Sequence, residues 1–161
     1  MAVTMDHLQL VNHTVCGAIA AAGFSVLFNV GYRYLPGCAA TGALALAIRT
    51  AAMQQGWSLV AASFLAALGV GIVVQLFQSR SGALRNALGV AGCIPMVPGV
   101  FTVRAILGLF AVASQHSDGT TDTLVTALEY SLRVAFTIGA LGTGLAIPTL
   151  LSSFRLSKQG N

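Results

Sequence analysis

The sequence predicts an all-α integral membrane protein, a single transmembrane domain of five helical spans with a discontinuous fourth helix. Of its 161 residues, 56% are hydrophobic and only 7% are charged, whereas soluble domains carry about 25% charged residues. So few charges cannot cover the surface of a soluble globule, and disorder requires low hydrophobicity. Five long apolar stretches supply the spans, and prolines interrupt the fourth.

Each apolar stretch is close to or above the ~20 residues that a helix needs to cross the hydrocarbon core. The five predicted spans are residues 8–30, 38–53, 57–77, 83–113 and 124–151. No Lys or Arg precedes the first apolar stretch, so we expect a retained helix and not a signal peptide there.

Short connections with turn-forming residues separate the spans. Pro36 and Gly37 follow the first span, and the turn after the second is Gln54-Gln55-Gly56. Residues 78–82 follow the third span, and residues 114–122 form the longest connection. Asp122 or Thr123 is expected to cap the fifth helix, since both residue types accept hydrogen bonds from helix N-termini.

The connections that carry basic residues alternate with connections that carry none, so these basic residues lie on one side of the predicted bundle. They follow the first, third and fifth spans: Arg33, Arg80, Arg85, Arg155 and Lys158. The turn at residues 54–56 has no charge, and the connection before the fifth span has Asp118 but no Lys or Arg. The positive-inside rule then places the N-terminus outside and the C-terminus in the cytoplasm. An even number of spans would break this alternation.

The fourth stretch is too long for one straight span. A helix of about 31 residues would be about 46 Å long, whereas the hydrocarbon core is about 30 Å thick. Pro95 and Pro98 have no N–H to donate within a helix, and Gly99 loosens the backbone further. We therefore predict two half-helices that meet at residues 94–99. Unpaired backbone at that depth must be buried in protein or line a polar cavity.

Rows of small residues predict close helix packing, which drives helix association in lipid. The rows are Ala39, Ala43, Ala47 and Ala51; Ser63, Ala67 and Gly71; and Ala135, Gly139 and Thr143, with Ala140 and Gly144 beside the last row. Internal packing explains most of them, and some are expected to serve a partner subunit. The three separate cysteines, Cys16, Cys38 and Cys93, are interpreted as small buried residues.

The segment from Pro95 through Met96 to Pro98 and Gly99 is the first candidate for substrate binding. The second half-helix presents the partial positive charge of a helix N-terminus, of about half a unit. Secondary transporters bind substrate carboxylates at such breaks. The alternative interpretation is a structural kink, which a single proline would suit better than two prolines and a glycine.

Three further polar residues are candidates for substrate contacts. Arg104 lies in apolar sequence, where a charge usually faces the bundle interior. It suits a bidentate bond to a carboxylate and, equally well, an internal ion pair or an interhelical anchor. Arg49 either contributes to the same site or extends towards the membrane surface near Gln54. Asn29 can donate and accept hydrogen bonds, as a substrate contact, a helix cap or an interhelical bond.

Glu129 is the acidic residue inside a predicted span and is a candidate proton carrier. It lies four residues before Arg133, which is the favoured order for a helical ion pair. The paired, structural interpretation is therefore preferred for Glu129.

Other functional classes have no support in the sequence. No GxSxG, HExxH or phosphate-loop motif appears, and the isolated Cys and His residues do not suit a metal site. We therefore expect no enzyme activity, no cofactor and no metal. The net charge of +4 comes from single basic residues between apolar runs, so nucleic-acid binding is not expected.

Several of these segments together resemble the threonine/serine exporter family (ThrE). They are Phe28-Asn29-Val30, Cys38-Ala39, Arg49 and above all Ile94-Pro95-Met96-Val97-Pro98-Gly99. The chain length and five-helix layout are similar to the small YjjB-like subunit, which corresponds to the C-terminal membrane half of the fused exporters. The resemblance implies a secondary transporter subunit in the bacterial inner membrane, with threonine or serine as substrate and a YjjP-like membrane subunit as partner. Arg104 and the Glu129–Arg133 pair have no place in the family pattern.

Three other functions stay open. Split members of the family have been linked to dicarboxylate export, so a succinate-type substrate is the first alternative. The chain is otherwise a scaffold subunit whose partner binds all substrate, or a homo-oligomeric channel. For the preferred function we expect alternating access, with two halves of opposite orientation and a site at their interface.

Overall fold

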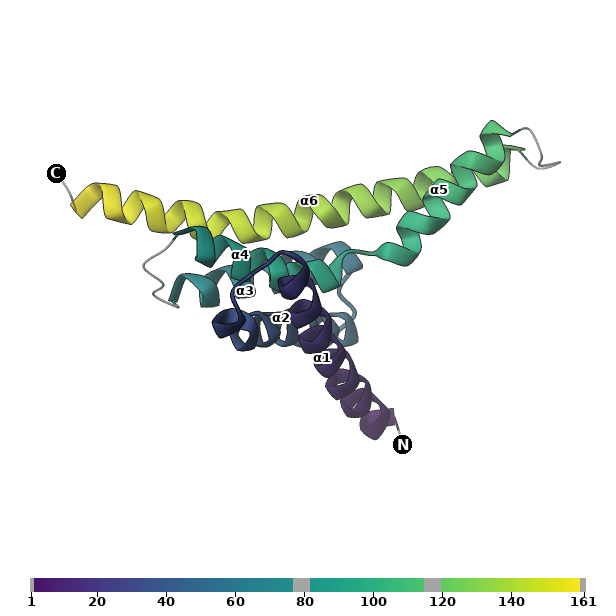
Figure 1. Ribbon diagram of the computed structural model, residues 1–161. Coiled ribbons are helices and arrows are strands. Elements are labelled where there is room, and N and C mark those ends of the chain that lie inside the picture. Colours follow the sequence, from purple (N-terminus) through teal and green to yellow (C-terminus); the bar gives the residue numbers. More distant parts are fainter. Residues whose placement is uncertain (1, 77–81, 115–119, 160–161) are drawn as a thin grey trace. The chain divides into compact units, whose positions relative to one another are not determined.

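The structure is a computed structural model of the chain and describes residues 2–76, 82–114 and 120–159. Every regular element in these ranges is helical, which confirms the predicted all-α fold. The elements in chain order are α1 (Ala2–Leu27), η1 (Tyr32–Tyr34), α2 (Leu35–Gln54), α3 (Leu59–Leu76), α4 (Gly82–Cys93), η2 (Ile94–Met96), α5 (Gly99–Ala113) and α6 (Thr120–Gln159). Figure 1 labels the α-helices among them.

The helices match the predicted membrane spans. Within the described ranges, α1, α2, α3 and α6 are each long and apolar enough to cross a bilayer. The pair made by α4–η2 and α5 meets the same criteria as one interrupted span. The protein is therefore a multi-pass membrane protein with up to five spans.

The chain forms two compact units. The first, here the main unit, comprises Met1–Met96 and Ala140–Asn161, and the second, here the hairpin unit, comprises Val97–Gly139. The main unit contains α1 to η2 and the C-terminal part of α6, whereas the hairpin unit contains α5 and the N-terminal part of α6.

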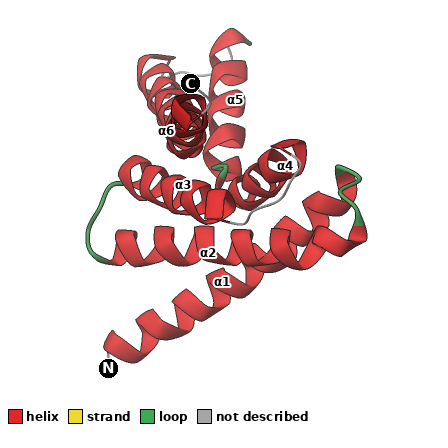
Figure 2. Cartoon of the chain, turned by 90° about the vertical axis from the view of Figure 1, so that its left-hand side faces the viewer, coloured by secondary structure: helices red, strands yellow, loops and turns green. Residues whose placement is uncertain are grey.

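The main unit is held by backbone-to-backbone approach of α1 and α2, which lie side by side in Figure 2. A Cβ atom added at Gly17 would lie 2.7 Å from the carbonyl oxygen of Gly42. A Cβ atom at Gly42 would in turn collide with the Cβ of Ala21, which is fully buried. Glycine at both positions thus lets the two helices pack at a distance that any larger residue prevents.

The C-terminal part of α6 packs on α3 and α4 through small residues. Ser63, Ala67 and Gly71 are all buried, which confirms that this row serves internal packing. A Cβ atom added at Gly144 would lie 2.8 Å from the carbonyl oxygen of Phe64, and one at Gly71 would lie 2.9 Å from the ring of Pro148. Gln75 donates a hydrogen bond of 3.1 Å to the Thr149 hydroxyl across the same contact.

The small-residue rows on α2 and α6 are less buried than the row on α3. The buried face of α2 carries Cys38, Thr41, Gly42, Ala45 and Ala52, whereas Ala39, Ala43, Ala47 and Ala51 are only partly buried. On α6, Ala135 and Gly139 are exposed. Their role in contact with a partner subunit stays a prediction. Of the cysteines, Cys38 and Cys93 are buried as expected, but Cys16 is exposed on α1, so that part of the prediction is wrong.

Two helices end in the same hydrogen-bonded turn. At the end of α1, Val30 N–H donates to Ser25 and Asn29 N–H to Val26, with Asn29 at φ 54°. At the end of α2, Trp57 N–H donates to Ala52 and Gly56 N–H to Met53, with Gly56 at φ 84°. This pairing is the Schellman motif, which needs a left-handed residue and favours Gly or Asn there. Gly56 of the predicted turn thus ends α2, whereas the turn at Asn29 ends α1 inside the predicted span 8–30.

Two boundaries of α6 differ from the prediction. The helix begins at Thr120, so Asp122 and Thr123 lie in its first turn and do not cap it. At the other end it continues beyond residue 151 to Gln159. Leu, Arg, Lys and Gln are good helix formers, and no Gly or Pro follows Pro148 until Gly160. The predicted basic residue Arg80 lies outside the described residues.

The Gly17–Gly42 contact gives a direct stability test. We expect Gly17→Ala to destabilise the protein by about 1–3 kcal/mol, because the new methyl group would force α1 and α2 apart. Gly23→Ala is the matched control on the same helix, since an added Cβ there meets nothing within 4 Å. Thermal unfolding in detergent would measure both. Equal melting temperatures of the two variants would contradict the close contact.

Candidate functional site

The predicted break in the fourth span is present. Helix α4 ends at Cys93, a single 3₁₀ turn follows over Ile94–Met96, and α5 begins at Gly99. Pro98 has φ −79° and ψ 72°, which is not helical. Both prolines lack a backbone donor, and the residue before a proline avoids the α conformation. The local sequence therefore explains why the helix cannot continue here.

The carbonyl of Met96 is bound by an arginine from α2. Arg49 Nη1 donates a hydrogen bond of 2.8 Å to the Met96 oxygen, 47 residues away in the chain. The end of a helix carries partial negative charge, and a guanidinium hydrogen bond compensates it. The half-buried Arg49 is thus directed to the break and not towards Gln54, contrary to the membrane-surface alternative.

The four predicted residues of the break differ in accessibility. The Met96 side chain is fully buried in the hydrophobic core of the main unit, so only its backbone is placed to meet a ligand. Pro98 is buried and Pro95 is partly buried. Gly99 is exposed, and an added Cβ there would meet nothing within 4 Å.

The first turn of α5 follows the break directly. Thr102 N–H and the Thr102 hydroxyl both donate to the Pro98 carbonyl, each at 3.1 Å. Gly99 N–H donates to the Val97 carbonyl at 2.8 Å. No side-chain hydrogen bond caps the α5 N-terminus. Its partial positive charge is thus left without a side-chain acceptor.

Asn29 has a conformational role. Its left-handed backbone completes the turn that ends α1, so the cap alternative is confirmed. The structure does not bring Asn29 to a hydrogen bond with Arg49, and its contact with substrate stays a prediction.

In the hairpin unit, charged and aromatic side chains alternate between α5 and α6. Glu129 and Arg133 form the predicted ion pair at 3.1 Å. The Arg133 guanidinium lies 5.3 Å from the centre of the Phe101 ring, which stacks on Tyr130 at 5.7 Å. Arg104 donates a 3.3 Å hydrogen bond to the Tyr130 hydroxyl. These contacts form one continuous group of side chains.

The two aromatic members of this group, Phe101 and Tyr130, were not among the predicted site residues. Phe101 and Arg104 stand three residues apart, and so do Tyr130 and Arg133. That spacing places an aromatic ring and a cation on the same face of each helix, and it was the signal available in the sequence. Arginine over an aromatic face is a favourable arrangement. Among the described residues Arg104 forms no ion pair, and its hydrogen bond to Tyr130 of α6 is the interhelical anchor considered for it.

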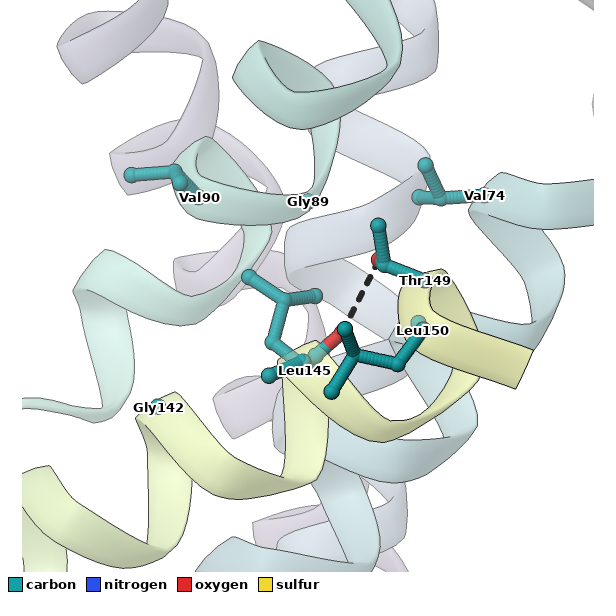
Figure 3. Close-up of a pocket in the computed structure, with 9 residues that line it drawn as sticks. Val74, Gly89, Val90, Gly142, Leu145, Thr149 and Leu150 are labelled. Carbon is teal, nitrogen blue, oxygen red and sulfur yellow. Dashed lines mark hydrogen bonds between the residues drawn. The ribbon is translucent and has the colours of Figure 1, made fainter. Parts of the chain in front are cut away.

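The main unit also contains an apolar cavity of about 380 Å³, drawn in Figure 3. It is lined by Gly71, Val74, Gly89, Val90, Gly142, Leu145, Ala146, Thr149 and Leu150. The Thr149 hydroxyl donates to the Leu145 carbonyl at 3.2 Å. None of the predicted site residues lines this cavity, and its apolar walls do not suit a charged solute.

A comparison with known families agrees with the layout of the helices. The family model described as Threonine/Serine exporter, ThrE, matches residues 13–151. This range includes the break, Arg49 and the whole hairpin unit. No solved structure matches the chain.

The Arg49–Met96 bond is expected to stabilise the break. Arg49→Met would leave the Met96 carbonyl without its donor and lower stability by about 1–3 kcal/mol. Arg49→Lys keeps a cationic donor and should lose less. Arg33→Met, at an exposed position in η1, removes the same charge and serves as the control. Thermal unfolding of the three variants is the measurement, and a wild-type melting temperature for Arg49→Met would refute the role.

Proposed function

Because the chain belongs to the threonine/serine exporter family, we propose that it is one subunit of a secondary transporter that exports small carboxylate solutes. Threonine and serine are the preferred substrates, and a YjjP-like membrane subunit is the proposed partner. The family is one of transporters, and several helices are apolar and long enough to span a bilayer. The proposed location is the bacterial inner membrane.

The observation that carries the proposal is the arginine at the broken span. Arg49 reaches Met96, which is separated from α5 by two residues. A guanidinium has five N–H donors, and the bond to Met96 uses one of its nitrogens. The remaining donors suit a carboxylate, which guanidinium groups bind through two parallel hydrogen bonds. We propose that Arg49 and the segment Pro95–Gly99 bind the substrate carboxylate.

The transport cycle follows from the break. Half-helices can move as separate bodies about non-helical residues, and Val97 and Pro98 provide such a link. In the proposed cycle the partner subunit supplies a second half of opposite orientation. Glu129 is the proposed proton carrier, and it forms an ion pair with Arg133 in the structure.

Efflux from cells that lack their own exporters tests the proposal. Cells preloaded with threonine, serine or succinate would express the chain alone or with a YjjP-like partner. We expect saturable efflux of threonine and serine only with the partner. Arg49→Gln should reduce efflux at least tenfold, since a charged hydrogen bond is worth about 1.5–3 kcal/mol, whereas Arg33→Gln should not.

The alternatives predict different results in the same assay. Preference for succinate would indicate the dicarboxylate exporter. Non-saturable efflux from the chain alone would indicate a homo-oligomeric channel. Full activity of Arg49→Gln with normal assembly would indicate a scaffold subunit.

The proposed orientation can be measured separately. With the N-terminus outside, the turn at Gly31 faces the cytoplasm and the turn at Gly56 faces the outside of the cell. In a cysteine-free background, Gln55→Cys should therefore react with a membrane-impermeant maleimide in intact cells, and Arg33→Cys should react only after the cells are opened. The reverse pattern would refute the orientation.

A further inference from the structure

The hairpin unit contains a hollow with opposite charges on its walls. It has a volume of about 280 Å³ and is lined by Arg104, Gly108, Asp122, Thr123, Thr126 and Ala127. Pockets for small molecules run from about 300 to 1,000 Å³, so this hollow suits only a small solute. All its residues belong to α5 or to the first eight residues of α6.

The two charges in the hollow are not paired with each other. Among the described residues of the hairpin unit, the charged side chains are Arg104, Asp122, Glu129 and Arg133. Glu129 and Arg133 form an ion pair. Arg104 is bound to the neutral Tyr130, and it forms no ion pair with the Asp122 carboxylate. Charges in membrane proteins are usually paired, but among the described residues neither Arg104 nor Asp122 forms an ion pair.

The Arg104 guanidinium is held in place by its neighbours. Its Cζ lies 5.7 Å from the centre of the Tyr130 ring, and its Nη1 donates to the Tyr130 hydroxyl. Tyr130 is in turn stacked on Phe101. These contacts orient the cation, while its other N–H groups are available to a ligand.

Two small residues and a threonine hydroxyl also line the hollow. An added Cβ at Gly108 would lie 2.7 Å from the Cβ of Ala127, so small residues let α5 and α6 come together below the hollow. The Thr126 hydroxyl donates a 2.8 Å bond to the Asp122 carbonyl. With its hydrogen used in this way, the Thr126 oxygen presents lone pairs that can accept a hydrogen bond.

We propose that this hollow binds a small zwitterion, with Arg104 on the carboxylate and Asp122 on the ammonium group. The inference rests on the proposed export function and adds a site at which an amino acid differs from a dicarboxylate. A second carboxylate in place of the ammonium would meet the Asp122 carboxylate, and like charges in close contact repel. Thr126 accepts a hydrogen bond from the hydroxyl of a threonine or serine ligand.

The test uses the full chain with its partner subunit in lipid nanodiscs and three related ligands. L-Threonine carries both charged groups, 3-hydroxybutyrate lacks the ammonium, and 1-amino-2-propanol lacks the carboxylate. Each ligand's Kd is obtained from its stabilisation of the folded protein against heat. Because each variant is compared with itself across ligands, a change in basal stability does not affect the Kd ratios.

For the wild-type chain we expect threonine to bind about tenfold to a hundredfold more tightly than either truncated ligand, as expected for one charged hydrogen bond. Asp122→Asn should bring threonine and 3-hydroxybutyrate to nearly equal Kd values. Arg104→Gln should do so for threonine and 1-amino-2-propanol. Asp6→Asn and Arg33→Gln remove the same charges in the main unit and should leave the ratios unchanged.

Two results would overturn the inference. The first is a wild-type chain that does not discriminate among the three ligands. The second is discrimination that survives both Asp122→Asn and Arg104→Gln. If threonine efflux nevertheless persists in that case, the export function stands and the zwitterion is selected elsewhere. Conversely, ratios that change as expected without any efflux would support the hollow and refute the export function.

Discussion

The structure depends on the backbone hydrogen bonds that two prolines remove from the fourth span. In a bilayer every polar backbone group needs a partner, and an unpaired one costs several kcal/mol. The α-helix therefore ends at Cys93, a 3₁₀ turn follows to Met96, and α5 begins at Gly99. The Met96 carbonyl accepts a hydrogen bond from Arg49. The requirement explains why a cation lies half-buried on α2, where it would otherwise be unfavourable.

The same constraint explains why the main unit is built from small residues. The α2 helix must lie close enough to the break for a side chain from residue 49 to reach it. Gly42 meets Gly17 of α1 on one side of α2, and an added Cβ at Gly92 would lie 2.8 Å from the Cβ of Thr41 near the end of α4. Thr41 also donates a hydrogen bond of 3.2 Å to the Leu88 carbonyl. Close packing of α2 on both neighbours thus positions Arg49.

Features that depend on local sequence were predictable. The spans follow from apolar length, and the break follows from Pro95 and Pro98, because both act on the backbone of their own helix. The turns at Asn29 and Gly56 are equally local. The target of Arg49 was not predictable, since Met96 lies 47 residues away and the contact depends on how α2 packs. The extension of α6 to Gln159 was not predicted, because an apolar stretch indicates a length that could cross a bilayer and does not mark the end of the helix.

The hairpin unit contains one ion pair and, in its hollow, two charged side chains that are not paired with each other. Glu129 and Arg133 satisfy each other one helical turn apart, so their charges need no external partner. Arg104 lies on a neutral tyrosine instead, and Asp122 shares its hollow without forming an ion pair with it. A contact between Arg104 and Asp122 would have neutralised both side chains and closed the space between them. Their separation preserves one charge of each sign with room for a small solute, and a zwitterion is the solute that neutralises both at once.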